Sequence, residues 1–175
     1  MKYFTLLLVL IMSFTGTKAQ EKEGYKFTMV KQVDASPVKD QFRSSTCWCF
    51  SSLSFIESEL MRMGKETYDL SEMYVVRQSY YEKAIKYVRL HGNLNFAGGG
   101  SFTDFINCWN KYGMLPEEIY DGLSYGEKAH VHGEIDAVLK NYVDAVIKNK
   151  NKKLSTAWVE GFEGILNAYF GEVPE

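Results

Sequence analysis

Apolar side chains recur at intervals of three and four residues along most of the chain, the spacing that favours amphipathic helices. Ser71 stands at the N-cap position of a helix that would begin at Glu72. Gly64 and Gly113 follow two of the apolar patterns as expected stops. The spacing predicts helices over five stretches, which are residues 47–63, 72–90, 103–112, 127–150 and 156–169.

Strand signals are few by comparison. Residues 20–36 are polar, with Val30 and Val33 as short apolar signals, so we expect an extended leading segment that supplies at most one edge strand. Residues 93–100 form a predicted loop that ends in three consecutive glycines, Gly98 to Gly100. The predicted fold class is therefore mainly α.

The first 19 residues have the layout of a secretory signal peptide. Lys2 supplies the positive start, residues 3–14 the apolar core, and residues 17–19 a cleavage site. The apolar core is shorter than the roughly 20 residues that a membrane-spanning helix needs. We expect export to the periplasm or the extracellular space, with no stable membrane insertion after cleavage.

A chain of 175 residues can form one domain with a substantial core and is short for two. We place this domain at residues 37–175, after the leading segment. Hydrophobic residues make up 46% of the chain, which argues against disorder. Without residues 1–19, 18 basic residues remain against 22 acidic ones. A nucleic-acid partner is not expected, because such binders carry a basic face.

The cysteines point to chemistry more than to stability. Their number is odd, so at least one of Cys47, Cys49 and Cys108 is unpaired in an exported chain. Cys47 and Cys49 are too close along a helix to form a bridge of ordinary geometry. Cys49 and Cys108 fall within apolar helical patterns and are expected in the core.

Cys47 is the candidate nucleophile. It follows small polar residues and opens an apolar helical pattern, and the positive end of a helix dipole favours a thiolate. Gln41 lies six residues upstream, far enough to loop back and place its amide beside the sulfur. A nucleophile and an amide donor are two of the parts that acyl transfer needs. A buried structural thiol is the alternative, and the neighbouring Gln41 and Trp48 favour the nucleophile.

These residues resemble the N-terminal half of a papain-like cysteine peptidase over about residues 37–122. The segment from Gln41 to Trp48 is the most specific part of the likeness. Further similarity lies at residues 37–40, 50–51, 70–72, 99–100, 112–113, 116 and 120–122. Residues 43–48 are similar to the active-site segment of the bleomycin hydrolase and aminopeptidase C group. Papain's own disulfide would need cysteines at the positions of Ser44 and Ala97.

The resemblance implies the helical N-terminal half of an α+β fold, with the β-rich half missing from this chain. It implies a thiolate that attacks peptide bonds, an amide that stabilises the oxyanion, and a glycine rim that pairs with the peptide backbone. The expected site residues are the catalytic pair Cys47 and Gln41 and the substrate-binding residues Trp48, Gly99, Gly100, Ser101 and Phe102. No cofactor and no metal are implied.

Two departures from the family pattern matter. Ser45 stands where the family has glycine, and its side chain is expected to crowd the backbone near the oxyanion. The family's catalytic histidine and asparagine lie well over a hundred residues after the cysteine. Beyond the glycine run this chain has only His130 and His132, in a stretch predicted to be helical. We therefore expect an incomplete peptidase that alone turns over poorly or not at all.

Other polar groups receive plainer interpretations. His130, His132 and Glu134 suggest a metal site, but alternate positions on a helix point to different faces, and zinc ligands do not follow that pattern. The tyrosines at positions 74, 80, 81 and 87 are expected to pack in the core.

Three functional classes remain open. The first is a cysteine peptidase, either an aminopeptidase or an endopeptidase, acting on peptide substrates. The second is a non-catalytic pseudo-peptidase that binds through the apolar face of a half-domain, with self-association or a separate second half as its partner. The third is an acyltransferase that uses the same Cys47 nucleophile.

Overall fold

The computed structural model describes residues 24–174, so the expected signal peptide at residues 1–19 lies outside the described part and stays a prediction. Contacts divide the chain between Gln32 and Val33, and each part is described by itself. Residues 24–32 have no regular secondary structure, and Tyr25, Phe27 and Val30 are exposed. The edge strand expected within residues 20–36 is absent from residues 24–36. It has nothing to pair with, because the described residues contain only isolated β-bridges.

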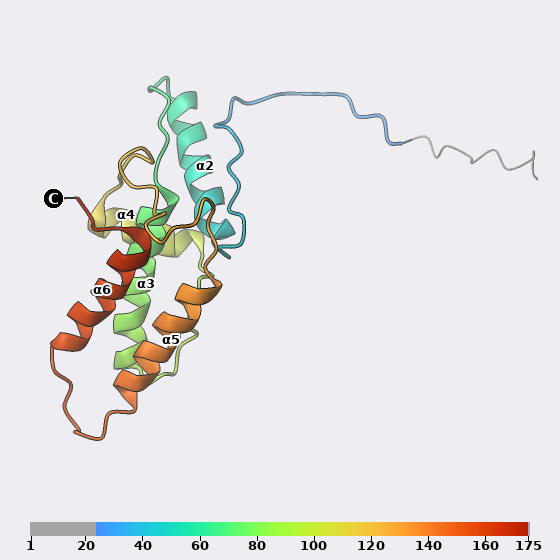
Figure 1. The fold of residues 1–175 in the computed structure, drawn as a ribbon. Helices are drawn as coiled ribbons and strands as arrows, with labels where there is room; N and C mark the ends of the chain where they lie inside the picture. The colour runs from blue at the N-terminus through green and yellow to red at the C-terminus, as the bar shows by residue number, and fades with distance from the viewer. Residues whose placement is uncertain (1–23, 175) are drawn as a thin grey trace, which may run out of the picture. The chain divides into compact units, whose positions relative to one another are not determined.

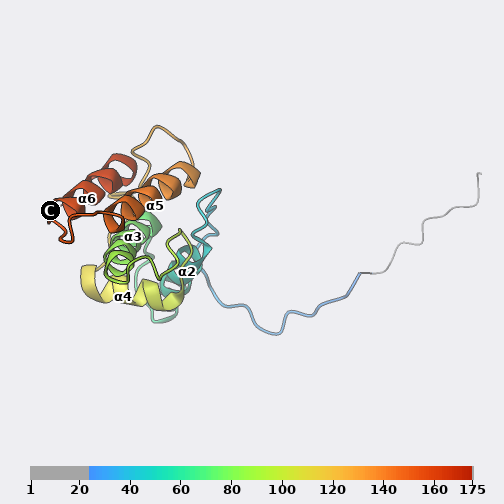
Figure 2. The same cartoon turned by 90° about the horizontal axis from the view of Figure 1, so that it is seen from below.

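From Val33 onward, the described residues are built around one central helix. The helices are α2 (Cys47–Arg62), α3 (Glu72–Arg89), α4 (Phe102–Tyr112), α5 (Gly133–Ile147) and α6 (Ala157–Phe170). Helix α3 packs against each of the other four. Helices α5 and α6 run together on one side of α3, and α4 lies on the opposite side (Figures 1 and 2). The mainly α prediction is confirmed for the described residues.

The first half of α3 is buried on every side. Residues 73–80 are all buried, although only part of them carry the apolar spacing. Four neighbouring helices leave this segment no solvent-facing stripe, so its polar side chains need partners inside the protein. The hydroxyl of Tyr80 donates to Asp136, and that of Tyr87 donates to Asp144 Oδ1 at 2.6 Å. These tyrosines pack in the core as predicted.

Helix termini fix the loops near the candidate site. The Ser71 hydroxyl accepts a hydrogen bond from Tyr74 N at 3.0 Å and caps α3 as predicted. Ser101 and Asp104 form a reciprocal capping box at the start of α4. The glycine loop therefore runs directly into a firmly capped helix.

Helix α5 is shorter than the pattern predicted. The helix expected over residues 127–150 begins only at Gly133, so His130 and His132 are not helical. The peptide at Val131 instead forms a parallel bridge with Arg43. Within the described residues, no helix is both long and apolar enough to cross a membrane.

Candidate active site

Cys47 is the first residue of α2, and its side chain is exposed. Thr46 occupies the N-cap position, and its carbonyl accepts from the backbone N–H of Cys49 at 2.8 Å. Cys49 and Cys108, in contrast, are both buried, and the Cys49 thiol donates to the Glu72 carbonyl at 3.4 Å. Burial raises the pKa of the Cys108 thiol to about 11. Only Cys47 therefore offers its sulfur to a substrate.

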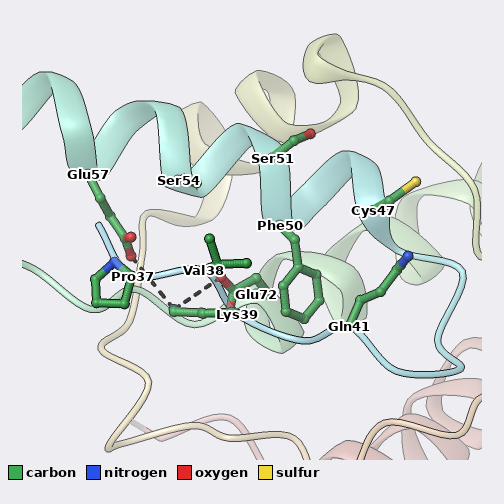
Figure 3. A pocket seen from close by; sticks show the side chains of 10 residues that line it. All are labelled: Pro37, Val38, Lys39, Gln41, Cys47, Phe50, Ser51, Ser54, Glu57 and Glu72. Carbon is green, nitrogen blue, oxygen red and sulfur yellow. Dashed lines mark hydrogen bonds and ion pairs between the residues drawn. The ribbon is translucent and has the colours of Figure 1, made fainter. Parts of the chain in front are cut away.

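The Gln41 side chain is held beside Cys47 by the backbone. Its Oε1 accepts a hydrogen bond from Thr46 N at 3.0 Å. Because a backbone N–H needs an acceptor, this contact assigns the oxygen and leaves the amide nitrogen free to donate. Figure 3 shows that nitrogen directed toward the Cys47 side chain, and both residues line the same cavity. The structure thus brings together the two residues predicted to be catalytic.

The turn between Gln41 and Cys47 contains two residues in the left-handed region. Phe42 has φ 48° and Ser45 has φ 59°. A non-glycine residue there costs about 1–2 kcal/mol, which is a physical reason for the glycine that the family resemblance led us to expect at position 45. The Ser45 side chain is exposed. The Ser45 side chain therefore does not crowd the backbone as expected, and the cost of a serine here is strain at its own φ angle.

Trp48, the residue that follows Cys47, contacts the loop that contains Gly98, Gly99 and Gly100. Its Nε1 donates to the Gly98 carbonyl at 2.9 Å, and its ring is buried. A Cβ added to Gly100 would lie 2.6 Å from that ring, and one added to Gly98 would lie 2.9 Å from the Tyr80 hydroxyl. Gly99 has open space around it. Close packing, and not turn conformation, therefore requires Gly98 and Gly100.

Ser101 and Phe102 lie where the glycine loop enters α4. Ser101 is engaged in the capping box, and its side chain is at the surface. Phe102 is 47% exposed and packs edge-on against Phe55, with ring centroids 6.0 Å apart. Phe102 therefore keeps apolar surface available next to the loop, whereas the Ser101 hydroxyl is already occupied by Asp104.

A cavity of about 300 Å³ lies between α2 and the segment that precedes it (Figure 3). It is lined by Pro37, Val38, Lys39, Gln41, Cys47, Phe50, Ser51, Ser54, Glu57 and Glu72. None of these ten residues is a histidine. The described residues therefore place no imidazole in the cavity that holds the thiol.

The opposite end of the cavity from Cys47 is charged, with two buried carboxylates, Glu57 and Glu72, around the partly exposed Lys39. Lys39 Nζ lies 3.0 Å from Glu72 Oε1, 3.7 Å from Glu57 Oε1 and 2.5 Å from Asp69 Oδ1. Burial lowers the pKa of Lys39, but the hydrogen bonds and charges of Asp69, Glu72 and Glu57 outweigh it and raise the pKa overall. Burial raises the pKa of Glu72, partly offset by Lys39. Glu57 also accepts from Leu70 N at 2.9 Å, so this cluster ties α2 to the start of α3.

His130 and His132 support the Cys47 turn through their backbone. Arg43 N donates to the His130 carbonyl at 3.0 Å, and His132 N donates to the Arg43 carbonyl at 3.2 Å. Neither ring nitrogen of the fully buried His132 has a partner. Burial, followed by the charge of His130, lowers the pKa of His132 to about 4. The predicted helical setting of these histidines is wrong, because a strand-like pairing with Arg43 competes with the helix.

The metal interpretation finds no support in the geometry. Among the described residues, no group of three or more His, Cys, Asp or Glu side chains is arranged to hold an ion. The His130 ring instead packs near the Phe50 ring, with centroids 6.3 Å apart.

The papain family cysteine protease profile matches residues 25–163. The chain belongs to the papain family of cysteine proteases. The family resemblance found in the sequence is therefore confirmed, together with the helical fold expected for half of a papain-like domain.

Relatives of this papain-family chain are considerably longer. Cysteine proteinase 1, mitochondrial, of Saccharomyces cerevisiae is 27% identical over 130 residues, covering 65% of this chain and 27% of the yeast protein. The crystal structure of PepW from Lactobacillus rhamnosis aligns with a TM-score of 0.57 and 19% identity, over 84% of this chain and 39% of PepW. The chain thus spans about a quarter of the length of the curated relatives it matches.

The sequence prediction missed the charged end of the cavity. Glu57 lies at helical spacing between Leu53 and Leu60, on the apolar side of α2. A carboxylate on an apolar face signals a buried cationic partner, but nothing in the spacing identifies Lys39 as that partner.

Proposed function

We propose that this chain carries the nucleophile and the oxyanion donor of a papain-like peptidase. The observation that supports it is the exposed Cys47 beside a Gln41 amide whose oxygen is already bound by Thr46 N. This leaves the amide nitrogen as a donor oriented before substrate arrives, and preorganised donors are the strongest means of stabilising an oxyanion.

In the proposed reaction, the Cys47 thiolate attacks the carbonyl carbon of a peptide bond, and a C–S bond forms as the carbonyl oxygen takes the negative charge. The Gln41 amide and the Cys47 backbone N–H donate to that oxygen. The C–N bond then breaks, and the leaving amine takes a proton from a general acid. Water hydrolyses the thioester and regenerates Cys47.

We infer that residues 24–174 bring no general acid to the cavity. No histidine lines it, and the ring nitrogens of His132 are buried. We propose that the group acting as general acid and general base comes from outside residues 24–174. The chain alone should therefore hydrolyse peptides slowly or not at all.

Two assays of the purified chain test this proposal. The first is hydrolysis of peptide-aminomethylcoumarin substrates, with Cys47→Ala as the negative variant. The second is the labelling rate of each cysteine by a peptidyl epoxide, followed by mass spectrometry. We expect selective labelling of Cys47 and little turnover. Fast turnover that is lost in Cys47→Ala contradicts the incomplete-site proposal, whereas slow, unselective labelling contradicts the nucleophile proposal.

A non-catalytic binding module is the second candidate, supported by the same absence of histidine from the cavity lining. It predicts that a non-hydrolysable peptide binds equally well to wild type and to Gln41→Ala, since no oxyanion forms. Isothermal titration with a peptide amide and with a peptide aldehyde separates the two candidates. A peptidase site loses affinity for the aldehyde in Gln41→Ala, whereas a binding module does not.

We also propose export of this chain through residues 1–19. A fusion of residues 1–25 to alkaline phosphatase, which matures only outside the cytoplasm, tests this. Activity of the fusion that is lost when residues 3–14 are interrupted by charges supports export, and an inactive fusion contradicts it.

A further inference from the structure

Lys83 of α3 carries its amine to the glycine loop. Its Nζ donates to the carbonyl of Ala97 at 3.0 Å and also to the carbonyl of Gly99. The same Nζ lies 5.8 Å from the centroids of the Trp48 and Tyr80 rings, within the range of cation–π attraction. One amine therefore contacts both the loop and the residue that follows Cys47.

No carboxylate competes for this amine. Within residues 24–174, Lys83 forms no ion pair, although Asp104 and Asp136 are close enough to raise its pKa somewhat against the lowering by burial. Asp104 is engaged by the N-cap of α4, and Asp136 accepts from Tyr80. The half-buried charge of Lys83 is thus satisfied by loop carbonyls, and charge-assisted hydrogen bonds are the stronger kind.

Three successive carbonyls of the loop accept from the protein interior. Lys83 binds those of Ala97 and Gly99, and Trp48 Nε1 binds that of Gly98. The next residue differs, because neither the N–H nor the carbonyl of Gly100 has a hydrogen-bond partner among the described residues. Gly100 also lies against the Trp48 ring too closely for a side chain. Its free backbone groups therefore lie against Trp48, the residue that follows Cys47, and can pair with an extended chain.

Nothing covalent fixes this loop. Ser44 packs near Gly98 and Ala97 precedes it, and neither can form a disulfide. The loop has no regular secondary structure: buried Phe96 anchors its first part in the core, and the three carbonyl contacts hold residues 97–99.

We propose that Lys83 is a positioning residue for peptide binding, holding the loop so that Gly100 presents its free N–H and carbonyl to an extended substrate backbone. The substrate part of this statement rests on the proposed function. The loop-holding part rests on the Lys83 contacts alone.

Lys83→Met tests the proposal because it keeps the length of the side chain and removes the charge. We expect the inhibition constant of a peptidyl epoxide for Cys47 to rise about tenfold, the size expected for losing hydrogen bonds to a charged group. The maximal inactivation rate and the rate of labelling by iodoacetamide should stay unchanged, since Cys47 and Gln41 are untouched. Hydrogen exchange of the Trp48 indole Nε1–H, which donates to the Gly98 carbonyl, should become faster as the loop loosens.

Two further variants serve as controls. Lys83→Arg restores donors and charge and should recover most of the peptidyl epoxide affinity. Lys86→Met removes an exposed lysine three residues further along the same helix. It should change neither the inhibition constant of the epoxide nor the hydrogen exchange. Should Lys83→Met melt below the assay temperature, Lys83→Gln takes its place.

Each outcome is decisive. Unchanged exchange of the Trp48 indole N–H in the folded Lys83 variant overturns the positioning role. An equal fall in epoxide and iodoacetamide labelling also overturns it, because that pattern marks a general loss of structure. If wild-type Cys47 does not react selectively with the epoxide, the proposed function fails. The hydrogen-exchange measurement then still tests whether Lys83 holds the loop.

Discussion

The two ends of the Cys47 cavity are built on opposite principles. At one end, Cys47 is exposed, Gln41 is neutral, and the turn between them is strained at Phe42 and Ser45. At the other end, partly exposed Lys39 pairs its charge with the buried carboxylates of Glu57 and Glu72.

The difference suggests that the Cys47 end serves reactivity and that the Lys39 end serves stability. Strain and exposure lower stability, and proteins tolerate them where a reactive group must meet a substrate. Removing one partner from a buried group of paired charges is destabilising, since it leaves another charge unpaired in the interior. We therefore expect substitutions at the Lys39 end to unfold the protein, and substitutions at the Cys47 end to change its reactivity.

The largest effect is expected for Lys39→Met. It leaves the buried carboxylates of Glu57 and Glu72 without their cation, which should lower the free energy of unfolding by about 3 kcal/mol. Urea unfolding followed by circular dichroism measures the loss. Cys47→Ser and the exposed control Lys65→Met should each change stability by less than about 0.5 kcal/mol. A Lys39→Met variant as stable as wild type would show that the Lys39 end of the cavity does not stabilise the fold.

The pH dependence should have opposite signs at the two ends. Burial lowers the pKa of His132, behind the Cys47 turn, from 6.5 to about 4. Between these values the unfolded chain binds a proton that the folded chain does not, so stability falls as the pH drops from about 6.5 to 4. Glu117 lies near the Lys39 end, where its backbone N–H donates to the Asp69 carbonyl at 2.9 Å, and burial and then Glu72 raise its pKa from 4.5 to about 7. The contribution of Glu117 to the free energy of unfolding is complete below pH 4.5 and is lost as the pH rises through 7.

Urea unfolding at several pH values between 4 and 7.5 separates the two effects. His132→Phe, which keeps a buried ring, should remove the loss of stability on the acidic side, and Glu117→Gln should remove the loss toward neutral pH. A wild-type pH profile in His132→Phe contradicts the assignment at the Cys47 end.

The glycine loop offers a matched pair of variants. Gly100→Ala places a methyl group 2.6 Å from the Trp48 ring and should cost about 1–3 kcal/mol by overpacking. Gly99→Ala meets no atom within 4 Å and should be close to neutral. Thermal melts of the two variants measure the difference. Equal melting temperatures would show that the Trp48 ring shifts to accommodate the methyl group without loss of stability.

The smallest effect is expected for Ser45→Gly. Relief of the left-handed strain at φ 59° exceeds the entropic cost of glycine, so stability should rise by about 0.5 kcal/mol. Ser51→Gly, inside α2, should instead lower stability by about 0.5 kcal/mol, since a helix interior disfavours glycine. Chemical denaturation resolves the two directions. A loss of stability in Ser45→Gly would show that the turn is held by its serine and is not strained.

The sequence by itself determined much of the helical framework and indicated that Gln41 lies close to Cys47. Apolar spacing, the Ser71 cap and the glycine stops predicted α2, α3, α4 and α6 to within a residue or two. The succession of Gln41, Cys47 and Trp48 predicted a nucleophile beside an amide. These features are local, because helix periodicity, capping and a six-residue turn are all encoded by neighbours in the chain.

Only the tertiary structure decided which distant groups meet. Arg43 pairs with the backbone around Val131 and shortens α5, Lys39 reaches Glu72, and Lys83 reaches the glycine loop. No periodicity encodes such contacts, because they depend on how helices pack around α3 and on which buried charges find partners there. For the same reason, the sequence placed His130 and His132 on a helix, whereas the fold uses their backbone to brace the turn that presents Cys47.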